Sequence, residues 1–246
     1  MGAGPITSKS ECNVITNMPS AAIVYARTDS ERLPQKALRP FAGTNLISHV
    51  LRRACRLDVD RIILATTTRS CDDVLVQHVK ALNKENEYCR EIDAFRGDCD
   101  DVVQRTKDAL SRFGVRRFAR INGDCPFFPV AALNGALHDM QYQFINNIRL
   151  RNWPYGMAVE VLDADFYLQE SEFVSADLRE HTTAHLYRCA KYPLEKNLAP
   201  IETPNNSPAR CFTIDTKEEY ECWSSFAETR NLDHFFDFEV GCKNST

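Results

Sequence analysis

Positively charged side chains are concentrated in the segment 26–36, which reads Ala-Arg-Thr-Asp-Ser-Glu-Arg-Leu-Pro-Gln-Lys. This segment follows the apolar run 21–25, and α/β folds bind ligands just beyond the carboxyl ends of such strands. Arg27 and Lys36 are residue types that bind phosphate groups, and Pro34 stiffens the loop that carries them. A solvated surface turn would carry the same charges. The position after the first strand favours a binding site for a polyanion.

Two aspartates follow apolar runs further along the chain. Asp124 lies in Arg-Ile-Asn-Gly-Asp-Cys-Pro at 120–126, and Asp215 lies in Cys-Phe-Thr-Ile-Asp-Thr at 211–216. Carboxylates at the carboxyl end of a sheet, facing a triphosphate, hold hard divalent ions such as Mg²⁺. Each also has a simpler interpretation, because Asp124 would open a turn and Asp215 would cap the helix that begins at Lys217. Together with the cationic loop, they predict one site for phosphates and a metal.

Short β-rich runs alternate with helical segments along most of the chain. Apolar residues recur with helical spacing at 46–54, 74–82 and 102–110. Asn45 caps the first of these segments, and the acidic run 98–101 places carboxylates at the start of the third. Such alternation predicts an α/β fold with helices on both faces of a largely parallel sheet. The expected strands are 21–26, 61–67, 91–95, 116–121, 142–148, 158–162 and 210–214.

The length of 246 residues is enough for one α/β domain with a full core. We therefore expect a single domain at 20–246, preceded by a flexible leader at 1–19 that is rich in Ser, Thr, Gly and Pro. The region of about 149–208 is interrupted by prolines and is less regular. It is typical of an insertion that shapes an acceptor site and, in a dimer, an interface.

Composition and charge exclude several classes of protein. A net charge of −4 gives no overall attraction for nucleic acid or for an anionic membrane, and no apolar run is long enough to span a bilayer. The ten cysteines lack the close C-x-x-C pairing of structural zinc sites and are expected to be reduced and mostly buried. We therefore expect a cytoplasmic protein that binds small anions, with neither nucleic acid nor membrane as a partner.

An ordered series of motifs resembles one family. The loop pattern Ala-Arg-x-x-Ser-x-Arg-Leu-Pro-x-Lys and the two aspartate motifs are similar to those of cytidylyltransferases. These include CMP-3-deoxy-manno-octulosonate synthetases, CMP-sialic acid synthetases and, most similar, the spore-coat polysaccharide cytidylyltransferases. The series continues with Phe-Arg-Gly at 95–97, Asp-Asp-Val-Val-Gln-Arg at 100–105, Pro-Tyr-Gly-Met-Ala-Val-Glu-Val at 154–161 and Arg-Glu-His-Thr-Thr at 179–183. It spans about 21–228, and an ordered series is more specific than any single motif.

The resemblance implies a three-layer α/β/α, Rossmann-like fold of the nucleotide-diphospho-sugar transferase type, with a mostly parallel mixed sheet. It also implies a Mg²⁺-dependent, homodimeric enzyme of polysaccharide or glycan biosynthesis. Such an enzyme transfers CMP from CTP to a sugar acid or related anionic acceptor and releases pyrophosphate. If the acceptor is instead a phosphate or phosphonate, no general base is required.

Residue roles follow from the resemblance by position in the motifs. The catalytic residues would be Arg27, Lys36, Asp124 and Asp215, with the two aspartates binding Mg²⁺. The nucleotide would be bound by Ala26, Arg27, Ser30, Arg32, Lys36, Arg96, Asn122 and Gly123. The acceptor would be bound by Tyr155, Glu160, Glu180 and His181.

The phosphate loop departs from the most similar group, whose usual pattern is Gln-Ala-Arg-x-Gly-Ser-x-Arg-Leu-Pro-Gly-Lys. Tyr25 replaces the Gln, while Asp29 and Gln35 replace the two glycines. Losing glycines reduces the access of the loop to positive φ, and Asp29 brings a negative charge near bound phosphates. A non-catalytic nucleotide-binding or partner-binding domain of the same fold is therefore the alternative.

Two further patterns suggest other metal chemistry. His181 and His185 are spaced i, i+4, as zinc ligands on one helical face are, but no third ligand lies near them. Asp-x-Asp occurs at 98–100 and at 163–165, which is the metal motif that a glycosyltransferase on a related sheet would carry. Each of these two segments is expected to open a helix, where carboxylates are common.

Overall fold

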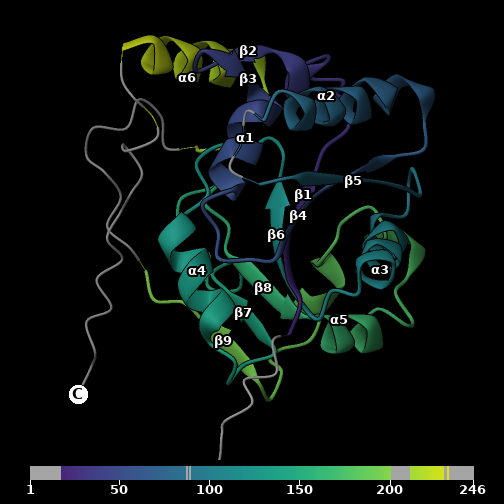
Figure 1. The fold of residues 1–246 in the computed structure, drawn as a ribbon. Coiled ribbons are helices and arrows are strands. Elements are labelled where there is room, and N and C mark those ends of the chain that lie inside the picture. Colours follow the sequence, from purple (N-terminus) through teal and green to yellow (C-terminus); the bar gives the residue numbers. More distant parts are fainter. Residues whose placement is uncertain (1–17, 87, 89, 201–210, 230–231, 233–246) are drawn as a thin grey trace, which may run out of the picture.

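The computed structural model describes residues 18–86, 88, 90–200, 211–229 and 232. Within this part of the chain, a seven-stranded sheet has the order β5-β4-β1-β6-β8-β7-β9 (Figure 1). Residues 1–17 of the predicted leader lie outside the described part. The strands of this sheet are β1 (Ser20–Tyr25), β4 (Arg61–Thr67), β5 (Ile92–Gly97), β6 (Arg117–Asn122), β7 (Phe144–Asn146), β8 (Glu160–Asp163) and β9 (Glu195–Asn197).

The sheet is mixed but mostly parallel, as predicted. β1 pairs in parallel with β4 and β6, and β4 pairs in parallel with β5. β8 runs antiparallel to β6 and β7, and β9 runs parallel to β7. Tyr25 at the end of β1 lies opposite Asn122 at the end of β6. The loops that follow these two central strands therefore leave the sheet side by side.

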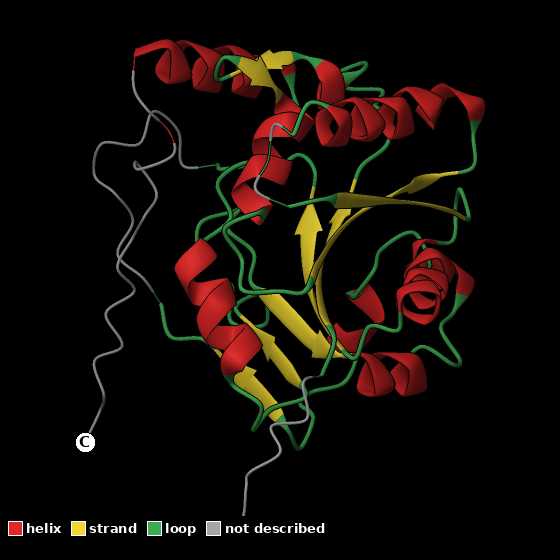
Figure 2. Cartoon of the chain, viewed as in Figure 1, coloured by secondary structure: helices red, strands yellow, loops and turns green. Residues whose placement is uncertain are grey.

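Helices cover both faces of the sheet, which gives three layers (Figure 2). Apolar residues of α1, α2 and α4 share one hydrophobic cluster, and those of α3 and α5 share another. A small hairpin and α6 lie at one end of the molecule in Figure 1. The α-helices are α1 (Leu46–Ala54), α2 (Asp73–Lys84), α3 (Val102–Phe113), α4 (Val130–His138), α5 (Ala164–Glu170) and α6 (Lys217–Thr229). The shorter elements are the hairpin strands β2 (Pro40–Phe41) and β3 (Thr44–Asn45) and the 3₁₀ helices η1 (Lys36–Leu38), η2 (Ser70–Asp72), η3 (Ala176–Leu178) and η4 (Ala184–Tyr187).

Strand β1 shows why the central strands appear in the sequence as continuous apolar runs. Ala22 and Val24 pack into the cluster on one face, whereas Ala21 and Ile23 pack into the cluster on the other. Successive side chains of a strand point to opposite faces, so a strand that is covered on both faces needs an apolar residue at every position. The run 21–25 therefore ends where burial ends, and the polar loop begins there.

A third hydrophobic cluster joins the carboxyl-terminal helix to the loops above the sheet. Trp223 of α6 is fully buried, with its ring centroid 4.2 Å from that of Phe127 and 5.3 Å from that of Phe212. Leu33 of the cationic loop and Ile214 belong to the same cluster. This packing fixes the segment before Asp215 against the loop that follows β1.

Several sequence predictions need correction. The expected strand 210–214 contributes only an isolated bridge between Cys211 and Tyr155, and position 210 lies outside the described residues. The expected strand 142–148 is shorter, and β9 is a strand that the apolar pattern does not reveal. The cysteines are not mostly buried, since Cys125 alone is buried among the seven in the described part of the chain. The predicted cap at Asn45 is confirmed by its hydrogen bond from the backbone of Ser48. In the acidic run 98–101, Asp101 is the N-cap of α3 and accepts from the backbone of Gln104.

No helix among the described residues is long and apolar enough to cross a membrane.

Candidate active site

A cavity of about 1270 Å³ opens at the carboxyl ends of β1 and β6. Its walls come from the loops that follow these strands, from Arg69, from residues within 99–105 and 147–158, from 180–182, and from Thr213 and Asp215. The volume exceeds the roughly 300–1,000 Å³ that is typical of a pocket for one small ligand. It leaves room for a nucleotide together with a second substrate.

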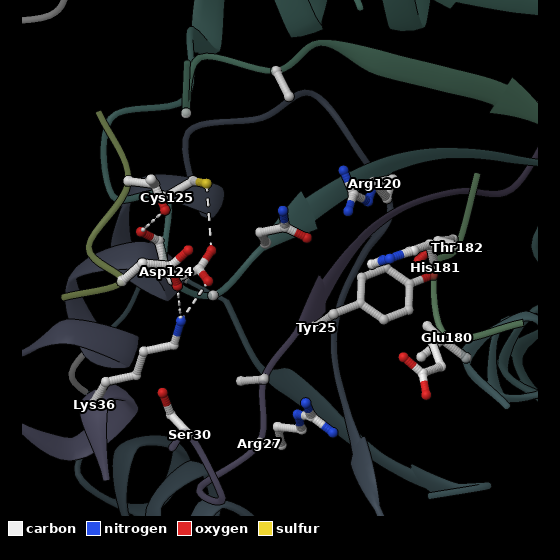
Figure 3. A pocket seen from close by; sticks show the side chains of 18 of the residues that line it. Tyr25, Arg27, Ser30, Lys36, Arg120, Asp124, Cys125, Glu180, His181 and Thr182 are labelled. Atoms are coloured by element: carbon white, nitrogen blue, oxygen red, sulfur yellow. Dashed lines mark hydrogen bonds and ion pairs between the residues drawn. The ribbon is translucent and has the colours of Figure 1, made fainter. Parts of the chain in front are cut away.

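At one end of the cavity, Lys36 contacts two carboxylates (Figure 3). Its Nζ donates to Asp124 Oδ2 at 2.6 Å and to Asp215 Oδ1 at 2.5 Å, although Lys36 and Asp215 are 179 positions apart in the chain. Arg32 Nη2 donates to the other oxygen of Asp215 at 3.0 Å. Burial opposes the charged form of Lys36, but the two carboxylates outweigh it and raise its pKa. Burial likewise opposes ionisation of Asp215, but Lys36 and Arg32 lower its pKa.

The carboxylate of Asp215 is not the cap of α6. Thr216 Oγ1 accepts from the backbone of Glu219 at 3.2 Å, and Glu219 Oε2 accepts from the backbone nitrogens of Thr216 at 3.0 Å and Asp215 at 2.7 Å. This reciprocal arrangement is a capping box, which satisfies the start of the helix without the Asp215 side chain. That side chain is turned instead toward Lys36, which favours the functional interpretation of this residue.

Asp124 is positioned by a close approach of the two central strands. The backbone nitrogen of Gly123 donates to Tyr25 O at 2.8 Å. A Cβ at Gly123 would lie 2.8 Å from Tyr25 O and 2.9 Å from the Cβ of Ala26, so only glycine allows this approach. Asp124 O then accepts from the backbone of Ile214 at 2.8 Å, which joins the loop after β6 to the segment before Asp215.

The two aspartates fit a magnesium ion. Carboxylate oxygens from two distant segments converge on one cationic group, the ammonium of Lys36. Mg²⁺ in proteins is held by one or two carboxylates, while water and substrate phosphates supply the other ligands. The described residues contain no group of three or more His, Cys, Asp or Glu side chains that would hold a metal ion by themselves. Asp124 and Asp215 thus fit an ion that is shared with a phosphate-bearing ligand.

The opposite end of the cavity carries Tyr25 and Arg120, with His181 beside them (Figure 3). Tyr25 Oη forms a hydrogen bond with Thr106 Oγ1 at 2.9 Å, and burial raises the pKa of Tyr25 to about 12. Arg120 Nη1 donates to Glu160 Oε2 at 2.7 Å. The Glu160 carboxylate is only 1% exposed, so it lies behind Arg120 and does not line the cavity.

The model of the cytidylyltransferase family matches residues 21–239. The chain belongs to this family. One relative is the spore coat polysaccharide biosynthesis protein SpsF of Bacillus subtilis, to which this chain is 27% identical over 208 residues. The aligned region covers 81% of this chain and 82% of SpsF. It is 29% identical over 121 residues to a 3-deoxy-manno-octulosonate cytidylyltransferase of Geobacter sulfurreducens, which covers 49% of this chain and 44% of that enzyme.

Solved structures support the fold of this cytidylyltransferase. A cytidylyltransferase from Leptospira borgpetersenii superimposes with a TM-score of 0.74 at 24% identity, over 90% of each chain. A CMP:2-keto-3-deoxy-manno-octonic acid synthetase in complex with CTP superimposes with a TM-score of 0.61 at 14% identity, over 86% of this chain and 99% of that one. The predicted Rossmann-like nucleotidyltransferase fold is confirmed.

Most of the residues that the sequence assigns to the site of the cytidylyltransferase come together in this one cavity. Two residues do not, namely Arg96 and Glu160. The predicted residues that line the cavity are Ala26, Arg27, Ser30, Arg32, Lys36, Asn122, Gly123, Asp124, Tyr155, Glu180, His181 and Asp215.

Arg96 is placed outside the cavity because its guanidinium is used by the backbone next to β4. Its Nε donates to Thr67 O at 3.0 Å, its Nη2 donates to Arg69 O at 2.9 Å, and its Nη1 forms an ion pair with Asp73. These contacts fix the turn between β4 and α2. Arg96 therefore supports this turn and does not line the cavity, and its predicted contact with the nucleotide stays a prediction.

Arg105 and Arg120, to which the sequence motifs assign no role, also line the cavity. Arg105 is only 3% exposed, its Nε donates to Asp98 O at 2.8 Å and its Nη2 donates to Cys99 O at 3.0 Å. Burial lowers its pKa. Both arginines could have been predicted as site residues from their motifs. Arg105 ends Asp-Asp-Val-Val-Gln-Arg, and Arg120 begins the motif that contains Asp124.

The phosphate loop is closed and anchored in spite of its missing glycines. Gln35 adopts the left-handed region at φ 53° and ψ 28°, which costs a residue with a Cβ roughly 1–2 kcal/mol. Its backbone nitrogen donates to Thr28 O at 3.3 Å. Thr28 in turn donates from its backbone and its hydroxyl to Asp72 Oδ1, at 2.7 and 2.8 Å. Gln35 thus reaches positive φ without being a glycine, at this cost in free energy.

The residues of the two alternative metal motifs make other contacts. His185 lies in η4 with its Nε2 3.0 Å from Ser171 Oγ, whereas His181 precedes that short helix and lines the cavity. Asp98 accepts from the backbone of Asp100 and Asp101 where α3 begins, and Asp163 forms an ion pair with Arg117 where α5 begins. Neither the zinc pair nor the glycosyltransferase motif is supported.

Proposed function

We propose that this cytidylyltransferase transfers CMP from CTP to a sugar acid and releases pyrophosphate. The supporting observation is the convergence of Lys36, Asp124 and Asp215 at one end of a large cavity in a member of this family. The relatives named for spore coat polysaccharide biosynthesis and for 3-deoxy-manno-octulosonate agree with a sugar acid that is destined for a polysaccharide. The acceptor itself belongs to the proposal.

The triphosphate of CTP is assigned to the loop after β1. Arg27, Arg32 and Lys36 supply positive charge there, and the Ser30 hydroxyl supplies a hydrogen bond. The base and ribose would lie against the ends of β1 and β6, where Ala26, Asn122 and Gly123 line the cavity. The side-chain amide of Asn122 suits a base, because an amide both donates and accepts hydrogen bonds.

Asp124 and Asp215 would hold Mg²⁺ together with phosphate oxygens. When bound, the ion would neutralise charge on the α-phosphate and on the departing pyrophosphate. The ammonium of Lys36 lies between the same two carboxylates and would pass to a phosphate oxygen as the triphosphate enters. Dependence on Mg²⁺ and assembly into a homodimer stay predictions from the family resemblance.

In the reaction, an acceptor oxygen attacks the α-phosphorus in line, and the bond to pyrophosphate breaks. The protein holds both reactants in position and neutralises developing charge, with no covalent intermediate. The acceptor would lie against Tyr155, Glu180 and His181, with its carboxylate near Arg105 and Arg120.

A sugar hydroxyl must also lose its proton, and the side chains at this end differ in their ability to take it. Glu160 is held by Arg120 and by Tyr187, whose hydroxyl donates to it at 2.8 Å. The raised pKa of Tyr25 keeps that phenol protonated near neutral pH. We therefore assign the role of base to His181, which lines the cavity at this end.

The test is pyrophosphate release by the full chain with Mg²⁺, each of the four nucleoside triphosphates and a panel of acceptors. Release is expected with CTP and a sugar acid, and mass spectrometry should identify the CMP conjugate. Asp124→Asn should abolish release, whereas Asp93→Asn, which alters an ion pair with Arg61 outside the cavity, should not. Conjugation to a phosphate or phosphonate alone would exclude the sugar acid. Absence of CTP binding at millimolar concentration would favour a non-catalytic domain.

A further inference from the structure

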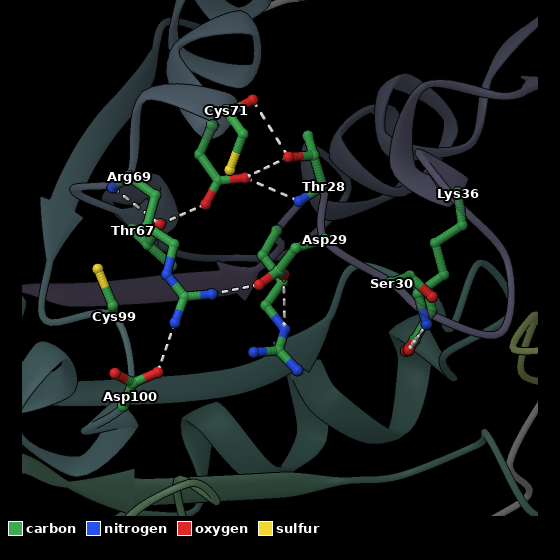
Figure 4. Close-up of polar contacts among 12 residues, drawn as sticks. Thr28, Asp29, Ser30, Lys36, Thr67, Arg69, Cys71, Cys99 and Asp100 are labelled. Carbon is green, nitrogen blue, oxygen red and sulfur yellow. Dashed lines mark hydrogen bonds and ion pairs between the residues drawn. The ribbon is translucent and has the colours of Figure 1, made fainter.

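The carboxylate of Asp29, within the phosphate loop, lies between two arginines at the edge of the cavity, and Figure 4 shows its contact with Arg69. Asp29 Oδ2 accepts a hydrogen bond from Arg69 Nη1, and Asp29 Oδ1 lies 3.2 Å from Arg27 Nε. Arg69 Nη2 donates to Asp100 Oδ1 at 2.6 Å. All four side chains line the cavity. Cations and anions therefore alternate along this edge, in the order Arg27, Asp29, Arg69, Asp100.

This arrangement is anchored from behind by a fully buried carboxylate. Asp72 accepts two hydrogen bonds from Thr28, the residue before Asp29, and a further one from the Thr67 hydroxyl. Thr67 Oγ1 in turn accepts from the backbone nitrogen of Arg69 at 3.2 Å. The backbones that carry Asp29 and Arg69 thus share one support. Their contact is a built part of the cavity wall, although both side chains are about one-third exposed, at 31% and 36%.

The two carboxylate oxygens of Asp29 differ in their contacts. Oδ2 forms a hydrogen bond with Arg69, whereas Oδ1 is buried and has no hydrogen-bond partner within the described residues. Its attraction to Arg27 is an ion pair without hydrogen-bond geometry, and the Arg27 side chain is 57% exposed. The ion pair of Asp29 with Arg27 should therefore break more readily than its hydrogen bond with Arg69. Arg27 is also the residue that the sequence predicts to bind phosphate.

We propose that Asp29 is a counter-charge that a polyphosphate chain must displace, and that Arg69 is a further phosphate-binding residue of this cavity. Before the ligand enters, Asp29 compensates both guanidinium groups. Phosphate oxygens then replace it on Arg27 and Arg69, because they offer the same charge-assisted hydrogen bonds. Asp100 keeps Arg69 directed into the cavity during the exchange. The proposal rests on the proposed function only in naming the triphosphate of CTP as the natural ligand.

The experiment is calorimetry on the full chain with two ligands, CTP and inorganic tripolyphosphate. Asp29→Asn keeps the shape of the side chain and removes the competing charge. It should raise the affinity for both ligands about two- to fivefold, as expected for one partly exposed ion pair. Arg69→Gln should lower both affinities roughly tenfold or more, because charged hydrogen bonds to phosphate are lost. In the double variant, the gain from Asp29→Asn should shrink.

Asp93→Asn is the matched control, because Asp93 is 30% exposed and pairs with Arg61 outside the cavity. It should leave both affinities unchanged. Tripolyphosphate affinity that is unchanged or lower in Asp29→Asn, with the urea midpoint of the wild type, would overturn the counter-charge. Wild-type affinity in Arg69→Gln would overturn the role of Arg69. A chain that gains tripolyphosphate affinity in Asp29→Asn but releases no pyrophosphate from CTP would overturn the proposed function alone.

Discussion

The two ends of the cavity hold their charges in different ways. At the Lys36 end, cation and carboxylates pair with one another across the cavity wall, and the Lys36 and Asp124 side chains remain 16% and 22% exposed. At the Arg120 end, Arg120 is backed by the carboxylate of Glu160, which is 1% exposed and does not line the cavity. Arg105 beside it is held by two backbone carbonyls. A ligand can exchange partners at the first end. At the second, it meets cations that are already fixed.

Removing the exchangeable cation should have the largest effect. Lys36→Met keeps the length of the side chain but leaves Asp124 and Asp215 without their shared cation. Under the proposed function, it also removes one of the cations that hold the triphosphate. We expect kcat/KM for CTP to fall about 10³-fold, as when one preorganised charge is lost from a transition-state site. Pyrophosphate release measures this. The control Lys84→Met, on the exposed end of α2, should stay within about twofold. A fall of less than tenfold would contradict an exchangeable role for Lys36.

Removing the buried charge that holds Arg120 should instead lower the free energy of unfolding. Glu160→Gln leaves Arg120 without a charged partner in a buried setting, so the free energy of unfolding should fall by about 3 kcal/mol. Urea denaturation measures the change. KM for the acceptor should also rise while KM for CTP stays the same. Glu221→Gln, in an exposed ion pair with Lys217, should change stability by less than about 0.5 kcal/mol. Equal losses in the two variants would remove the distinction between the ends.

The smallest effect concerns the pH dependence of stability and His185, which lies outside the cavity in η4. Burial lowers the pKa of His185 from 6.5 to about 4, so the unfolded chain takes up its proton first as the pH falls. The stability that His185 contributes is complete above pH 6.5 and is lost as the pH falls toward 4. Between pH 7 and pH 5 the loss should be about 2 kcal/mol.

Urea midpoints at the two pH values test this dependence. His185→Gln should flatten the loss, whereas His138→Gln, at an exposed histidine, should leave it intact. An unchanged pH dependence in His185→Gln would show that this histidine is not held neutral by burial.

Local patterns were enough to predict the central strands and most helices. The strand at 61–67 and the helix at 46–54 have the predicted bounds, because their apolar residues follow the period of a strand or a helix that lies against the core. The apolar pattern does not predict β9, because its three residues are polar. Glu195 is nevertheless 3% exposed, and its carboxylate pairs with Arg149 at 2.6 Å. Only a tertiary contact makes this segment part of the sheet.

The site was predictable where a motif ends a strand and unpredictable where side chains turn away from it. Asp124 follows β6 as predicted, whereas Asp215 is brought beside it by the hydrogen bond from the backbone of Ile214 to Asp124 O, since 211–214 is not a strand of the sheet. Arg96 and Glu160 lie in motifs that resemble the family equally well, yet backbone carbonyls hold the first and Arg120 holds the second. The sequence does not encode such side-chain directions locally, because they depend on which distant groups need a partner.

The third hydrophobic cluster makes completion of the site a late event in the life of the chain. Leu33 near its start and Trp223 near its end pack in one cluster, and the same packing brings Asp215 to Lys36. Domains emerge from the ribosome amino-terminal end first, and contacts between distant segments form slowly because a long loop must close. A nascent chain can thus assemble β1, β4, β5 and β6 while Asp215 is still unsynthesised. The central strands can therefore pair first, and Asp124 and Asp215 meet at Lys36 only once the segment that leads into α6 has been synthesised.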